Sequence, residues 1–101
     1  MDTQNLIIES KARFNHNQAK QYLKDKYQSK LTFADQGGLW VATPELIVFL
    51  DSANSEELIL LDSYENPIKV DRKKLFDKVR DTYNDVMGNW HNEWVILEKK
   101  R

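Results

Sequence analysis

The sequence predicts an α+β fold with a long helix at each end of the chain and, between them in sequence, a β-hairpin, a short helix and a second β-hairpin. Three observations predict it: helical periodicity at both ends of the chain, two central segments that combine extended apolar patterns with turn formers, and a proline-led helix start between them. With 101 residues, 41% of them apolar, the chain is long enough for one core. We therefore expect a single globular domain, residues 1–101, with both long helices on one face of a small antiparallel sheet.

The N-terminal segment is expected to be helical to about Lys30. At 100° per residue its apolar side chains fall on one stripe, which comprises Ile8, Ala12, His16, Ala19, Leu23 and Tyr27. Asn15 and Gln18 have the spacing of a capping box, so a restart or kink of the helix near residues 15–17 stays open.

The next segment predicts a hairpin and then a short helix. Residues 31–34 and 39–41 are extended in pattern and flank the turn formers of residues 35–38; one strand with an ordered loop is the alternative. Thr43, Pro44 and Glu45 then form a helix-start signature of cap, first-turn proline and first-turn acid. The apolar run of residues 46–50 suits a buried strand by composition, so a strand remains the alternative to a helix ending near residue 52.

A second hairpin and a long helix complete the prediction. Residues 58–61 and 68–70 flank the turn formers of residues 62–67, and Asp71 is placed to cap a helix from Arg72 to Glu98. Its apolar stripe consists of Leu75, Phe76, Val79, Tyr83, Val86, Met87, Trp90, Trp94 and Leu97. Such a helix is about 40 Å long, more than the roughly 34 Å width of a globule of this size, so its end should overhang unless the helix breaks near Gly88.

Composition excludes several classes of protein. The absence of Cys removes disulfide scaffolds, thiolate metal sites and cysteine nucleophiles. No run of apolar residues is long enough for a signal peptide or a membrane span, so we expect a cytoplasmic protein with no membrane contact. The net charge of −1 is divided unevenly: residues 1–30 carry six basic and three acidic side chains, residues 31–70 one and seven, and residues 71–101 eight and six.

The residues that carry acid–base chemistry do not form a recognisable motif. His16 and His91 lie far apart in the chain without metal-ligand spacing, and Asp35, Asp51 and Asp62 each follow an apolar stretch, where acids commonly cap turns and helices. We predict no catalytic residue, no metal site and no cofactor, and hence no enzyme. A small metal-dependent hydrolase built on one of these aspartates with His16 is the second alternative.

The preferred interpretation is a non-catalytic accessory or interaction protein. Aromatic and Met side chains, which are enriched at association surfaces, gather late in the last helix, at Tyr83, Met87, Trp90, His91 and Trp94. If the helix overhangs, these side chains need a second chain to cover them, which predicts a homodimer or another protein partner. The alternative is that Trp90 and Trp94 simply cover the sheet.

A basic stripe on the first helix provides the first alternative function. Arg13, Lys20 and Lys24 lie within about 40° of one another on the helical wheel and can follow a phosphate backbone. The tail of residues 99–101 adds three basic side chains. This pattern predicts a nucleic-acid-associated module, although a solvated helix face has the same pattern.

Two stretches carry a resemblance to a group of proteins. Residues 31–46 (LTFADQGGLWVATPEL) and residues 64–73 (YENPIKVDRK) resemble small uncharacterised proteins of T4-like marine phages of the cyanophage type. The resemblance implies a small accessory protein that acts in the cytoplasm of an infected bacterium. It assigns no functional residues and no mechanism.

Overall fold

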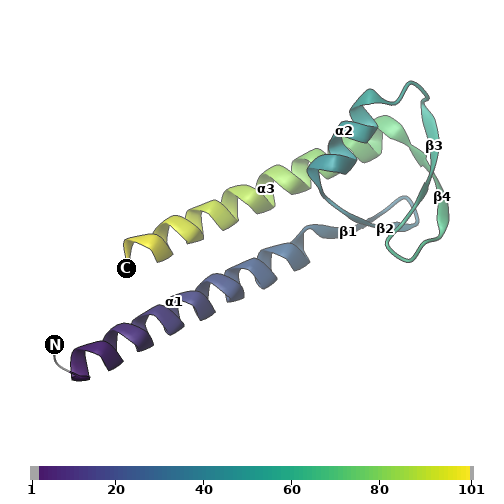
Figure 1. Cartoon of the computed structure of the whole chain (residues 1–101). Coiled ribbons are helices and arrows are strands. Elements are labelled where there is room, and N and C mark those ends of the chain that lie inside the picture. Colours follow the sequence, from purple (N-terminus) through teal and green to yellow (C-terminus); the bar gives the residue numbers. More distant parts are fainter. Residues whose placement is uncertain (1–2, 101) are drawn as a thin grey trace.

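The computed structural model describes the backbone of residues 3–100 and the side chains of residues 11–100. It confirms the α+β fold class and the predicted order of elements (Figure 1). In chain order the elements are α1 (Thr3–Lys30), β1 (Thr32–Asp35), β2 (Gly38–Val41), α2 (Pro44–Ser52), β3 (Glu57–Leu61), β4 (Pro67–Asp71) and α3 (Arg72–Lys99).

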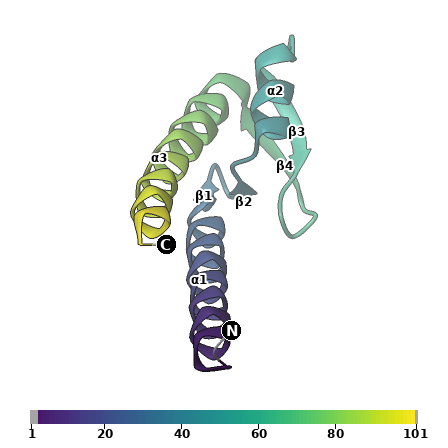
Figure 2. The same cartoon turned by 60° about the vertical axis from the view of Figure 1, so that its left-hand side comes forward.

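The molecule is elongated and has two parts (Figures 1 and 2). A head, residues 31–79, holds both hairpins, α2 and the beginning of α3; an arm consists of α1 and residues 80–99 of α3, which lie side by side and point away from the head. The chain measures 66 × 24 × 18 Å, and its radius of gyration of 19.4 Å compares with about 13 Å for a compact chain of this length. The last helix therefore leaves the globular part, as its length predicts.

Helix α1 is continuous, and the break considered near residues 15–17 does not occur. No Gly or Pro interrupts the segment, and His16 faces α3, where it lies 3.4 Å from Glu98. The predicted apolar stripe is buried only near the head, at Leu23 and Tyr27, whereas Ala12 is exposed. The side chain of Ile8 lies outside the described residues.

The first hairpin turns tightly at Gln36 and Gly37, which have φ values of 51° and 83°. Two positive φ values in succession match a turn whose twist suits the flanking strands. The strained Gln36 is held by its side chain, because its amide nitrogen donates to the carbonyl of Asp71 at 3.4 Å and its amide oxygen accepts from the Asp71 N–H at 2.7 Å. On β2, the Trp40 ring packs so closely over Gly38 that a Cβ there would lie 2.7 Å from it.

A buried carboxylate adds to the Gln36–Asp71 bonds that join the second hairpin to the first. Asp62, which is 9% exposed, accepts the backbone N–H groups of Leu39 at 3.1 Å, Tyr64 at 3.0 Å and Asn66 at 2.9 Å. The N–H of Ser63 in turn donates to the Leu39 carbonyl at 2.8 Å. These donors lower the pKa of the Asp62 carboxyl, the Asn66 N–H most strongly, because they stabilise its charged form.

The strands form two separate two-stranded sheets within the described residues, where one small sheet was expected. The register pairs Phe33 with Trp40 in the first sheet and Ile59 with Lys69 in the second. The two hairpins meet at Leu39, but there the Asp62 side chain and the turn that follows it provide the bonds. The connection is therefore made by the Asp62 and Gln36 side chains and a turn, and no continuous ladder runs through both hairpins in the described residues.

Residues 44–52 are helical, which resolves the alternative left open for this run. The Thr43 hydroxyl accepts the N–H of Leu46 at 3.1 Å, and Pro44 occupies the first turn, where its missing N–H has no cost. One face of α2 buries Leu50 in the head. The Arg72 guanidinium donates to the Leu50 carbonyl at 3.0 Å and so ties the end of α2 to the beginning of α3.

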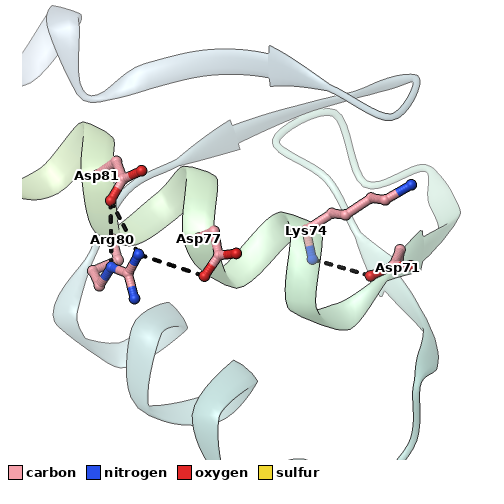
Figure 3. Close-up of polar contacts among 5 residues, drawn as sticks. All are labelled: Asp71, Lys74, Asp77, Arg80 and Asp81. Atoms are coloured by element: carbon pink, nitrogen blue, oxygen red, sulfur yellow. Dashed lines mark hydrogen bonds and ion pairs between the residues drawn. The ribbon is translucent and has the colours of Figure 1, made fainter.

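Helix α3 begins at the predicted cap and continues through Gly88 without a break. Figure 3 shows the Asp71 carboxylate accepting the N–H of Lys74 at 3.0 Å. It also shows Arg80 between Asp77 and Asp81, at 3.5 and 3.3 Å, which relieves the repulsion between acids on this exposed face.

Two apolar clusters hold the described part together, and α3 contributes to both. The head cluster is centred on Trp40, Ala42, Leu50, Val70, Leu75 and Val79. The arm cluster is smaller and is centred on Leu23, Tyr27 and Val86. The helices thus do not both lie on one sheet face as expected: α1 packs along α3, because its buried side chains match the second half of the α3 stripe.

In the described part of the chain, no helix has the length and apolar character required to cross a membrane.

Replacement of Asp62 by Asn should destabilise the head and change its acid response. The carboxylate accepts three N–H groups, whereas an amide is uncharged and offers one acceptor oxygen. Since the pKa of Asp62 is lowered by folding, its contribution is present above the ordinary carboxyl pKa near 4 and disappears as the pH falls through the lowered value. Thermal unfolding should show D62N several degrees below the wild type at pH 7, with the difference shrinking in acid.

The matched control is Glu65→Gln, which changes an exposed acid in the same turn. A D62N difference that is the same at pH 7 and in strong acid, or an equal effect of E65Q, contradicts this role for Asp62.

Candidate functional site

Two stacked rings fix the spacing of the arm helices. Tyr27 on α1 is buried and lies parallel to Trp90 on α3, with ring centroids 6.1 Å apart and planes inclined by 10°. Leu23 and Val86 are buried beside them. This contact joins residues 63 positions apart in the chain, so no local sequence pattern predicts it.

A groove of about 620 Å³ runs along one side of this seam. From α1 it is lined by Asn17, Lys20, Gln21, Leu23 and Lys24. From α3 it is lined by Met87, Trp90, His91 and Trp94. Lys20 and Lys24 of the predicted basic stripe therefore lie across a single groove from most of the predicted aromatic tail, two sets that the sequence presented as alternative surfaces.

Two predicted site residues lie outside this groove. Tyr83 is half-buried and lies at the base of the arm, where it packs against the head cluster. Arg13 lies one step further along α1, in an adjoining hollow of about 700 Å³ that is also lined by Asn17, Leu97 and Lys100. Since Asn17 borders both hollows, Arg13 extends the basic wall toward the free end of the arm. Of the predicted basic tail, Arg101 lies outside the described residues.

The aromatic wall has one covered and one open indole. Trp90 is partly covered by Tyr27, whereas Trp94 is 39% exposed. The exposed His91 stacks on Trp94 with ring centroids 5.8 Å apart. Planar rings at the groove surface offer faces that accept apolar groups, other aromatic rings or cations.

The opposite side of the arm differs in its electrostatics. There the Lys26 ammonium lies 3.0 and 3.2 Å from the carboxylate oxygens of Glu93, and this bond raises the pKa of Lys26 and lowers that of Glu93. Lys26 and Lys30 each lie 5.1 Å from the Tyr27 ring centroid, and burial raises the pKa of the Tyr27 phenol. On the groove side, none of the ion pairs among the described residues includes Lys20 or Lys24.

The residues proposed for hydrolytic chemistry are dispersed. Asp62 is occupied by backbone donors, while Asp35 at the end of β1 and Asp51 on α2 lie in the head. His16 lies on the arm, 3.4 Å from Glu98 of α3. Among the residues described, no cluster of three or more His, Asp or Glu side chains is arranged to hold a metal ion. What the arm brings together is a groove with a cationic wall and an aromatic wall.

Comparisons with protein-family models, with curated proteins and with solved structures give no match for this chain.

Removal of the two groove indoles, one at a time, should affect stability to different extents. Trp90→Ala removes the ring that packs on Tyr27, and we expect it to lower the free energy of unfolding by about 2 kcal/mol. Trp94→Ala removes an exposed ring and should change it by no more than about 0.5 kcal/mol. Urea denaturation in dilute solution measures both, and equal losses for the two variants would show that the seam is wrongly assigned.

Proposed function

We propose that the chain is a non-catalytic interaction protein that associates with itself through its arm. The observation that carries the proposal is the exposed surface. The chain exposes 7523 Å², whereas a compact monomer of 12.0 kDa exposes about 6,000 Å². The excess of about 1,500 Å² per chain exceeds the roughly 800 Å² that each partner buries in a standard interface.

The arm is the part of the molecule that needs this cover. A pair of helices buries only the stripe where they touch, and among the described side chains the arm's buried cluster is centred on three residues. A second layer of helices supplies the missing contacts in four-helix bundles. Association of two arms would bury Trp94 and the remainder of the groove in the same way.

The cellular role follows as part of the same proposal. Resemblance of residues 31–46 and 64–73 to small phage proteins supports a phage-encoded accessory protein in the host cytoplasm. Such a protein acts by binding, and the groove offers ammonium groups and indole rings for this purpose.

Sedimentation velocity tests the association directly. The wild type should sediment as a dimer at about 10 μM, while Trp94→Glu, which introduces a charge into the groove, should be monomeric or raise the dimer Kd by roughly a hundredfold. Phe14→Glu is the matched control, because Phe14 is 62% exposed on the same arm and borders neither hollow of the groove side. A wild type that remains monomeric at about 100 μM rules the proposal out.

A nucleic-acid-associated role is the second candidate, because the lysines and the indoles face one another. Single-stranded nucleic acid is bound by surfaces that combine cations for the phosphates with rings on which bases stack. Lys20, Lys24 and Trp94 provide this combination in one groove. The net charge of −1 argues against strong non-specific attraction, which is why this role ranks second.

Fluorescence anisotropy with a labelled oligodeoxythymidine separates the two candidates. If the groove binds nucleic acid, the affinity is highest near 20 mM salt, falls steeply at higher salt, and is lost in K20E/K24E but kept in K73E/K74E, a head variant of equal net charge. No binding at low salt eliminates this candidate, since phosphate contacts are strongest there.

A further inference from the structure

We propose that the groove is filled by the same groove of a second copy, with α1 of each copy lying over α3 of the other. This inference rests on the proposed self-association and assigns the partner, the face and the relative direction of the two arms. It follows from the symmetry of dimers, the distribution of charge between the two helices and the chemistry of the two groove walls.

Symmetry leaves two simple ways to place one arm face to face on another. In a twofold dimer the same patch is used by both copies, so each contact occurs twice. If the twofold axis runs along the arms, the arms point in the same direction and α1 lies over α3 of the partner copy. If the axis runs across the arms, they point in opposite directions and α1 lies over α1 of the partner copy.

The charges favour the first arrangement. The α1 wall of the groove carries Lys20 and Lys24, whereas none of the described α3 residues that line the groove is a Lys or an Arg. Stacking α1 on α1 brings two strongly basic surfaces together, with Lys20 and Lys24 of both copies in one groove. Like charges held in contact oppose association, whereas charges more than about 8 Å apart are screened at physiological salt. The charges on the contact surface therefore determine which arrangement is favoured.

The walls of the groove complement each other in the first arrangement. Lys20 and Lys24 of one copy lie over the indole wall of Trp90 and Trp94 in the other, and the reciprocal contacts form at the same time. Ammonium groups over indole faces are favourable, more so when water is excluded. The arm already uses this chemistry within one chain, where Lys26 and Lys30 lie 5.1 Å from the Tyr27 ring centroid.

Charge variants of the groove test the arrangement by the sign of their effect. K20E/K24E places carboxylates over the indoles and should raise the dimer Kd by roughly tenfold or more, while K20R/K24R preserves the cations and should remain within about threefold of the wild type. K73E/K74E, which makes the same change of net charge in the head, is the control. If K20E/K24E dimerises as tightly as the wild type or more tightly, α1 does not lie over the indoles and the arrangement is wrong.

Cross-linking gives an independent answer, because the natural chain contains no Cys. Q21C and H91C chains, carrying different affinity tags and confirmed as dimers by sedimentation, are mixed and treated with a short bismaleimide. Our arrangement predicts cross-links between Q21C and H91C chains and few between two Q21C chains; efficient cross-linking of Q21C to itself supports the opposite arrangement and overturns ours. A monomeric wild type overturns both this inference and the proposed function, whereas a dimer with the wrong cross-links overturns the inference alone.

Discussion

The structure depends on α3, whose first half packs in the head cluster and whose second half packs in the arm cluster. Leu75 and Val79 complete the head, and Val86 and Trp90 complete the seam with α1. A 28-residue helix is too long for a head of this size, so its second half leaves the globular part. Burying one stripe of that half is the role of α1, and the stack of Tyr27 on Trp90 sets the separation at which the two helices lie. The groove exists because two helices that pack side by side leave a groove on each side of their contact.

Local signals predict the elements well, and the reason is visible in their caps and turns. Thr43, Asp71 and the turn at Gln36 act through bonds to nearby backbone groups, so sequence positions within a few residues determine them. The composition of residues 46–50 did not distinguish helix from strand, and the Thr43 cap decides the outcome. Helix α3 continues through Gly88 for a related reason. One glycine lowers helix stability by about 1 kcal/mol, which is less than the packing of the helix on both sides of it contributes.

The arrangement of these elements could not be predicted in the same way. The Asp62 carboxylate reaches Leu39, the Gln36 amide reaches Asp71 and Lys26 reaches Glu93, and each of these contacts joins residues from 23 to 67 positions apart. A single sequence carries no record of such pairings. For the same reason, the basic stripe of α1 and the aromatic tail of α3 were each recognised by helical periodicity but were taken as separate surfaces. Their junction in one groove, like the stack of Tyr27 on Trp90, is supplied only by the structure.

That junction makes the two candidate functions compete for the same atoms. A dimer that covers Trp94 with the partner's lysines leaves neither the cations nor the indole free for a nucleic acid, and a bound strand likewise excludes the second copy. Binding free energies are reciprocal, so an oligonucleotide that enters the groove must weaken the dimer by the same factor by which dimerisation weakens oligonucleotide binding. The opposite side of the arm is excluded from this competition, because Lys26 is already paired with Glu93 there. Among the described residues, Lys26 is paired on one side of the arm, whereas the groove on the other side retains Lys20 and Lys24 beside an exposed ring, so under either candidate function the groove side would provide the contact.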